Sequence, residues 1–529
     1  RPTNDHLDAM VYIDDIMRDG AVCSFKDPLK RPHQLFLGGD QIYADDVSPL
    51  HLSHLIELGK ELIGSDTKGE ARERLMVDHI SKALLPETQQ RLEDFGPPLA
   101  RGAPGVSVDE LLFPADAQYF PPGRRFLLTT VEAQMTTADG YSHLFSLGEF
   151  AAMYLSVWSN AVWIPVGSRE EGDSVNALPP ASSVISAQWP ERIPAYVDAP
   201  LFADETRGHG DELSPFQNYT PFKKAAEESS PNVEKRLEVH RQQLAMFERG
   251  LPKVRRVLAN IPTYMMFDDH DVTDDWNLNP QWYDRVMTTS LGVNTLRNAL
   301  VSYALFQDWG NDPLRYQEAG SVPRRVLERI PDLFPGKQTP GPDATAANDL
   351  DTLFGFNLRG TVDPLDGHVV EINPPMKWHF SVPGPKHLAV AIDNRTRRSF
   401  VSREGPPGNV GVGALPEQIP AGPFTDGKEV LLVIAPLQVI GPPLLDELIA
   451  PAAYRVFDMK SFTVQGKAKR GLKDGSRGMP GTNPDAIEAW AFDPKTFEAL
   501  LERLEPYRRV VILSGDVHYS ASNVMSYFK

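Results

Sequence analysis

Acidic side chains gather at the ends of three apolar stretches of this sequence. The stretches run into GGDQIYADD at 38–46, MMFDDHDVTDDW at 265–276 and VVILSGDVHYS at 510–520. Apolar runs bounded by turn residues predict buried strands of a mixed or parallel sheet. Ligands of open α/β sheets bind just beyond the carboxyl ends of the strands, so residues far apart in the chain can meet there. The side chains expected in one crevice are Asp40, Asp269, His270, Asp516 and His518.

Converging carboxylates repel one another, so a site of this kind predicts a bound cation. Five carboxylates and one histidine lie between Asp268 and Asp275, and their spacing does not fit the calcium loop of helix–loop–helix sensors. Asp516 and His518 stand two positions apart, which points both to the same face of a continuing strand. Such a pair suits a transition metal or a hard divalent cation. The competing interpretations are an ordinary Gly-Gly-Asp turn and a solvated acidic loop.

Basic side chains follow a fourth apolar run. The segment IDNRTRRSF places Arg395 and Arg397 directly after HLAVA. Guanidinium groups at a strand end match the geometry of phosphate oxygens. A solvated basic turn, or ion pairs with the acidic loops, explains the same pattern equally well.

Composition narrows the class of protein. The chain has 529 residues, a formal net charge of −18 and one cysteine. The charge disfavours a nucleic-acid backbone as partner, and a single cysteine rules out an intrachain disulfide framework. No apolar run is long enough for a membrane span. G-x-S-x-G, Walker A and strand-linked G-x-G-x-x-G motifs are absent, which counts against serine hydrolases, nucleotide-loop ATPases and dinucleotide oxidoreductases.

Helical periodicity and turn residues predict the elements that position these groups. Helices are expected at 5–20, ending at Gly20, at 147–163, from Pro231 to Gly250, at 293–310 and at 494–504. Residues 165–232 predict an irregular excursion or lid, and 310–350 a surface loop. His51 and His54 lie three positions apart on a predicted helix without an acid to complete a site, so both are expected at the surface.

The set GDQIYAD, DDHDVTDDW and SGDVH, in this order, resembles the alkaline phosphatase D (PhoD-like) branch of the metallophosphoesterases. RPHQLFL before the first motif and DNRTRR between the second and third add to the resemblance. It implies a four-layer α/β/β/α sandwich with a metal centre at one edge of its sheets. It also implies hydrolysis of phosphomonoesters or phosphodiesters of small molecules or polymers, by a metal-activated water or hydroxide.

The resemblance also assigns roles. The implied metal ligands are Asp40 as the bridging group, Tyr43, Asp268, Asp269, Asp516, His518 and, from a weaker match, Tyr154. His270 would protonate the leaving oxygen or bind phosphate, with Asp269 beside it as a catalytic group. Arg395 and Arg397 would hold substrate oxygens. Two or more metal ions are implied, iron and calcium among them.

Departures from the family pattern shape the expected organisation. Asp274 and Asp275 stand where relatives often carry an Asn pair. The long span between the first two motifs predicts a largely helical insertion, so the domain is expected to comprise 1–48 and 231–529 around an inserted cap at 49–230. Both chain ends are expected to be truncated, and the family's first metal ligand would precede residue 1. The sequence leaves oligomeric state open and fits a cytoplasmic or an exported protein.

Two other functions compete with a phosphoesterase. One is a metal-dependent hydrolase of another ester or amide class, although the H-x-H-x-D-H pattern of such enzymes is missing. The other is a non-catalytic scaffold that binds calcium through its acidic clusters. Loss of the imidazoles at His270 and His518 would abolish turnover in an enzyme and leave a structural calcium site nearly unchanged.

Overall fold

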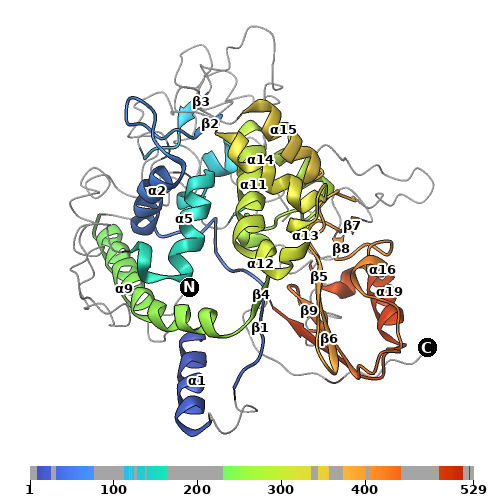
Figure 1. The fold of residues 1–529 in the computed structure, drawn as a ribbon. Coiled ribbons are helices and arrows are strands. Elements are labelled where there is room, and N and C mark those ends of the chain that lie inside the picture. The colour runs from blue at the N-terminus through green and yellow to red at the C-terminus, as the bar shows by residue number, and fades with distance from the viewer. Residues whose placement is uncertain are drawn as a thin grey trace.

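The computed structural model is a mixed α/β arrangement of helices and small sheets (Figure 1). It describes residues 9–24, 31–76, 112–163 without 118–119, 121, 124, 126–127 and 138–139, 230–334, 343–356, 373–400, 406–441, 488–515 and 524. Asp516 and His518 lie outside the described residues. None of the described helices is both long and apolar enough to cross a membrane.

Two sheets carry the strands that the sequence predicts. Strand β1 (Leu35–Gly38) pairs in parallel with β4 (Thr263–Met266). A four-stranded mixed sheet has the order β10 (Val510–Ser514), β9 (Val430–Ala435), β6 (His387–Ala391) and β5 (Phe380–Pro383). Its pairs are parallel except β5 with β6. The prediction that all three acid-linked strands are buried holds only for the end of β4: the residues of β1 are half-buried, and Val511 and Leu513 of the edge strand β10 are 44% and 49% exposed.

The two sheets touch where their strands end (Figure 1). A Cβ on Gly38 would lie 2.6 Å from Cγ2 of Ile434, a residue of β9. A Cβ on Gly515, directly after β10, would lie 2.6 Å from the Gly38 carbonyl oxygen. Only glycine permits so close an approach of the two backbones. The carboxyl ends of β1 and β10 therefore meet, as the convergence argument requires.

A helical layer covers the β1–β4 pair. Helices α2 (Pro49–Ile63) and α5 (Leu147–Trp158) pack together closely, with Gly59 against Gly148. A capping box starts α5, in which Ser146 and Glu149 satisfy each other's backbone N–H groups. Side chains of α2, α5, β4 and the buried helix α11 (Ser290–Tyr303) share one hydrophobic cluster. The inserted-cap boundary at 49–230 stays a prediction, but its described part packs as one core with the rest.

Three predicted helix ends are wrong. The helix expected at 147–163 ends at Trp158, and a separate 3₁₀ turn follows it. Helix α1 (Met10–Ser24) runs past Gly20, and α9 (Ser230–Asn260) runs past Gly250. Gly250 serves as a contact between the helices rather than a stop, since a Cβ there would lie 3.0 Å from Val11 Cγ2. Ion pairs of Arg256 with Asp14 and of Lys253 with Asp15 hold the additional turns of α9 against α1.

The predicted surface loop at 310–350 is also wrong. It contains α13 (Pro313–Gln317), α14 (Val322–Leu333) and α15 (Ala344–Leu353). Asp312, Ser321 and Asp343 cap them by accepting hydrogen bonds from backbone N–H groups of the first turns. Pro313 and Pro323 occupy the first turns of α13 and α14, where a missing N–H costs nothing, although Pro331 lies inside α14.

Helix α19 (Pro494–Leu504) confirms the predicted helix at 494–504. The other described elements are β2 (Arg74–Met76), β3 (Leu112–Pro114), α10 (Pro280–Val286), α12 (Trp309–Asn311), β7 (Ser399–Phe400), β8 (Pro407–Gly408) and α16 (Leu415–Gln418). Short 3₁₀ or π-helical turns are Leu128–Glu132, Gly140–Ser142, Asn160–Val162, Asp269–Asp271, Ala304–Asp308 and Trp490–Phe492.

His51 and His54 are buried, so the surface prediction for them is wrong. His51 packs its ring against Trp163, with ring centroids 4.9 Å apart. A ring nitrogen of His54 lies 2.9 Å from the Val162 carbonyl oxygen. Burial, together with the neighbouring His54, lowers the pKa of His51 to about 3. Sequence spacing alone did not show that residues 160–163 fold back over this face of α2.

Candidate metal centre

The loops after β1 and β4 lie side by side because these two strands are parallel neighbours. Backbone N–H of His270 donates a hydrogen bond of 3.2 Å to Asp40 Oδ1. In return the Ala44 N–H donates to the His270 carbonyl oxygen at 2.7 Å. Two loops separated by more than two hundred residues are thereby fixed against each other.

Two groups of potential ligand atoms share one aspartate. The atoms of Asp40, Asp269 and His270 lie within 4.8 Å of one another, and so do those of Asp269, Asp274 and Asp275. The Asp275 N–H donates to Asp269 Oδ2 at 2.9 Å, while Asp275 itself has a φ of 64°. A non-glycine residue in this left-handed region stores strain that the surrounding structure must hold. This turn places Asp274 and Asp275 next to Asp269, which also lies close to Asp40.

His270 is oriented by a residue that sequence reasoning overlooked. Its Nδ1 lies 2.7 Å from Asp45 Oδ1, and the other oxygen of Asp45 accepts from Thr137 Oγ1 at 3.1 Å. Tyr43 stacks on the imidazole with ring centroids 4.3 Å apart. Among the described residues nothing hydrogen-bonds to Nε2, and the side chain is 21% exposed. Asp45 belongs to the first motif, yet its spacing gave no sign that the loop turns it toward His270.

Asp271 lies behind this pair and is tied down by donors. Its Oδ2 accepts from the N–H groups of Gln41 and Asp268 at 3.3 and 3.1 Å. Its Oδ1 accepts from the Tyr154 hydroxyl at 3.0 Å, and Gln307 donates to that hydroxyl at 3.1 Å. Tyr154 is thus fully buried beside Asp271. Its predicted role as a metal ligand stays a prediction.

Arg395 lies inside the acidic region with all of its side chain buried. Its guanidinium contacts Asp268, then Asp269 Oδ1 at 3.1 Å and Glu488 Oε1 at 2.9 Å. Arg398 donates to the same Glu488 oxygen at 2.6 Å. Glu488 is therefore a second functional neighbour that the sequence did not reveal, since it lies about ninety positions downstream.

Arg397 pairs with an acid outside this cluster. Its guanidinium donates to Glu417 Oε2 at 2.8 Å and is itself 1% exposed. The structure thus brings Asp40, Tyr43, Asp268, Asp269, His270, Tyr154 and Arg395 together. Asp516 and His518 lie outside the described residues, but Gly515 next to them lies against Gly38.

The pKa values of the acids in this region shift in both directions. Burial opposes a lower pKa, but Arg395 and His270 lower the pKa of Asp269, and His270 lowers that of Asp45. Burial, with Asp269 and Asp268 nearby, raises the pKa of Asp40 well above its usual range. Burial raises the pKa of Asp271 to about 7 and that of Asp268 to about 6, although Arg395 works against the latter. Burial opposes charge on His270 as well, yet Asp45 and Asp269 raise its pKa. Protonation of these acids or a nearby positive charge would relieve their mutual repulsion.

The residues present fit a bound cation. Oxygen ligands from carboxylates suit hard cations such as Ca²⁺, Mg²⁺ or Mn²⁺. Oδ2 of Asp268 and Oδ1 of Asn277 are buried without a hydrogen-bond partner in the described part of the chain. A buried acceptor in that condition costs free energy unless a donor or a cation meets it. The arrangement can therefore hold a cation beside an imidazole that Asp45 orients.

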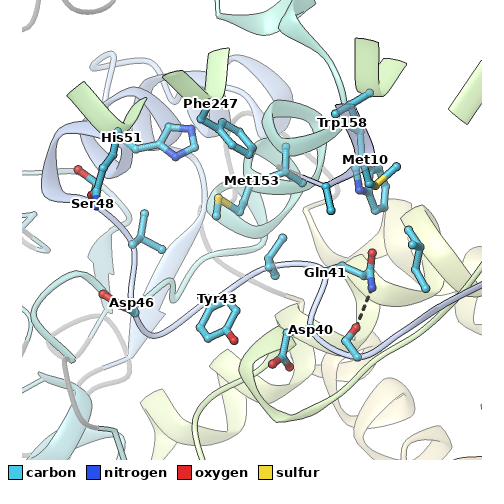
Figure 2. A pocket seen from close by; sticks show the side chains of 18 of the residues that line it. Met10, Asp40, Gln41, Tyr43, Asp46, Ser48, His51, Met153, Trp158 and Phe247 are labelled. Carbon is cyan, nitrogen blue, oxygen red and sulfur yellow. Dashed lines mark hydrogen bonds between the residues drawn. The ribbon is translucent and has the colours of Figure 1, made fainter. Parts of the chain in front are cut away.

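A cavity of about 740 Å³ opens beside the centre. Figure 2 shows Asp40 and Tyr43 on one side of it, with Met153 and Phe247 across from them. Helices α1, α2, α5 and α9 supply most of the other walls. The candidate ligand Asp40 thus borders a space large enough for a small molecule.

Comparisons with known protein families, with curated proteins and with solved structures each found no significant match.

Proposed function

We propose that this chain is a metal-dependent phosphoesterase that hydrolyses phosphomonoesters or phosphodiesters. The observation that carries the proposal is the meeting of Asp40, Asp269 and His270 from two strand ends. The Asp45–His270 hydrogen bond adds an oriented imidazole to that acidic centre. The motif resemblance to PhoD-like metallophosphoesterases supports the same reaction. The four-layer sandwich of that family remains part of the proposal, since small sheets and one four-stranded mixed sheet are what the described residues form.

Metal ions would be held by Asp40 and Asp269, with Asp274 and Asp275 as ligands of a second ion that shares Asp269. Asp516 and His518 would join them by resemblance, and iron with calcium is the pair that the resemblance implies. Bound metal would neutralise the phosphate oxygens and lower the pKa of the attacking water.

His270 is the group we assign to proton transfer. Its Nδ1 is held by Asp45, which leaves Nε2 for the substrate. Water attacks phosphorus, the bond from phosphorus to the ester oxygen breaks, and the leaving alcohol takes its proton from Nε2. The proton that the water loses restores the imidazolium. Asp45 acts through His270 and is a positioning residue.

The arginines differ in role under this proposal. Arg395 contacts Asp268, Asp269 and Glu488 and is fully buried, so it orients the carboxylates rather than meeting substrate. Arg397 is occupied by Glu417 and would reach a phosphate only after leaving that partner. Phosphate binding therefore falls chiefly to the metal ions and His270.

The test is hydrolysis by purified protein stripped of metal with a chelator and then reloaded. 4-Nitrophenyl phosphate and bis(4-nitrophenyl) phosphate report monoester and diester activity, with Ca²⁺, Mn²⁺ and Fe³⁺ added singly and in pairs. Turnover that disappears with the chelator and returns with metal supports the proposal. An equally active stripped protein overturns the metal requirement. Stoichiometric metal without hydrolysis of either ester favours the calcium-scaffold alternative.

A further inference from the structure

The cavity beside Asp40 has walls of unusual composition for a phosphoesterase cleft. Apolar side chains dominate it, among them Met153, Val157 and Trp158 of α5 and Leu244 and Phe247 of α9. Among the described residues that line it, none is Lys or Arg, whereas Asp40 and Asp46 both contribute. Apart from the imidazoles of His51 and His240, a second negative charge on a ligand would meet no basic side chain from the described walls.

The apolar wall faces the candidate centre directly. Tyr43 borders the cavity and stacks on His270 at a centroid distance of 4.3 Å. Figure 2 shows Tyr43 and Asp40 side by side at its edge. A phosphate held at Asp40 would therefore have its ester substituent in reach of Phe247 and Met153. Through this stacking the imidazole of His270 lies next to the edge of the cavity that Tyr43 forms.

We propose that this cavity binds the alcohol portion of the substrate, and that this portion is uncharged and apolar. The inference rests on the proposed function and names its substrate class: phosphate esters of alkyl or aryl alcohols. Burying methylene groups of the substrate in the cavity raises kcat/KM through the hydrophobic effect. Esters whose alcohol ends in a carboxylate or another phosphate bind poorly, because the described wall offers that charge no Lys or Arg.

A matched substrate series tests the inference on metal-loaded protein. Ethyl, n-hexyl and 5-carboxypentyl phosphate have similar leaving alcohols, so differences report binding in the cavity rather than chemistry. Each is assayed as the monoester and as its methyl diester. We expect kcat/KM for the hexyl ester to exceed that for the ethyl ester by about ten-fold or more. The carboxypentyl ester should fall back to the ethyl value or below.

Variants of α9 locate the effect. Phe247→Ala removes apolar wall, and Leu244→Asp adds a charge at a half-buried position without emptying the core. Each should reduce the hexyl-to-ethyl ratio by about ten-fold. Arg255→Ala, an exposed position on the same helix, is the matched control and should leave the ratio unchanged. Because Leu244→Asp does not depend on Phe247 being replaceable, a misfolded Phe247 variant does not remove the test.

The outcomes separate the two proposals. A hexyl preference that both cavity variants weaken supports the inference. Hydrolysis without a hexyl preference, or with one that the variants do not change, overturns it while the phosphoesterase stands. Absence of hydrolysis for every ester with every metal overturns the phosphoesterase and, with it, the substrate class.

Discussion

Two buried clusters of charged side chains in this molecule differ in how well their acidic and basic groups are balanced. Arg125 and Glu149 form a balanced pair, 0% and 1% exposed, with two contacts of 2.7 and 2.9 Å. Arg125 also donates to the carbonyl oxygens of Phe120 and His143. Around Asp40 and Asp269, by contrast, acids outnumber their cationic partners, and three of them have raised pKa values.

The difference teaches how to tell structural charge from functional charge. A satisfied pair such as Arg125–Glu149 fixes one local geometry, here the start of α5. An unsatisfied cluster lowers stability unless something outside the chain completes it. The Asp45–His270 pair combines features of both clusters. Nδ1 of His270 has a hydrogen-bond partner in Asp45, whereas among the described residues Nε2 has none. The predictions below separate these cases by their consequences for activity and for stability.

The largest effect is expected from His270→Gln. It removes the proposed proton donor, so kcat should fall by about 10²–10⁴-fold. Metal content, measured by elemental analysis, should remain, because the carboxylates are untouched. Unchanged turnover in this variant would contradict the role assigned to His270 in proton transfer.

Arg125→Met should instead affect stability. It leaves the buried Glu149 without its cation, which costs about 3–5 kcal/mol in the free energy of unfolding. Denaturant titration measures the loss, and Arg324→Met, which breaks the exposed pair with Glu328, is the control and should cost about 0–1 kcal/mol. Activity per folded molecule should not change. A pair of variants equal in stability would remove the distinction between the clusters.

Asp45→Asn should have an intermediate effect. The imidazole loses its orienting carboxylate, so kcat should fall by about ten- to a hundred-fold, in line with other orienting partners. KM and metal content should stay near their original values, because Asp45 is proposed neither as a metal ligand nor as a residue that contacts the substrate. A fall confined to KM, or a parallel loss of folded protein, would show that Asp45 is only structural.

The smallest effect concerns His51 and the pH dependence of the free energy of unfolding. The pKa of His51 is lowered by burial to about 3, so the folded protein keeps it uncharged while the unfolded chain takes up a proton below about pH 6.5. Below that pH the unfolded state binds more protons, and stability falls with falling pH by at most about 1.4 kcal/mol per unit until the folded group titrates. His51→Phe keeps the contact with Trp163 and should flatten this slope. Unfolding curves at pH 7, 6 and 5 measure it, and equal slopes would exclude His51 as the cause.

Much of the framework could be predicted from the sequence. Short apolar runs such as LFLG and TYMM favour strands, and β1 and β4 confirm the two strands predicted there. Parallel pairing of neighbours then suffices to bring Asp40 near His270. Helix ends were harder, because glycine marks either a stop or a close contact. Gly250 is a close contact with Val11 rather than a helix stop, and the sequence of α9 alone does not contain that contact.

The finer parts of the site could not be predicted for a related reason. Asp45 and Glu488 act through loops whose course no periodic pattern records. For Arg395 the sequence favoured substrate oxygens and ion pairs with the acidic loops equally, and the structure shows the ion pairs, with Asp268 and Asp269. Charge type told what chemistry to expect. The partner of each charge depended on the tertiary fold.

Metal binding to Asp40→Asn tests the central claim most directly. Isothermal titration of the chelator-stripped protein with Ca²⁺ and with Mn²⁺ gives stoichiometry and affinity for the unaltered chain and the variant. Asp332→Asn, an exposed acid with the same change in net charge, controls for non-specific attraction to a chain of net charge −18. The account predicts tight binding that Asp40→Asn weakens by about ten-fold or more and Asp332→Asn leaves unchanged. Equal binding in all three proteins, or none in any, would contradict it.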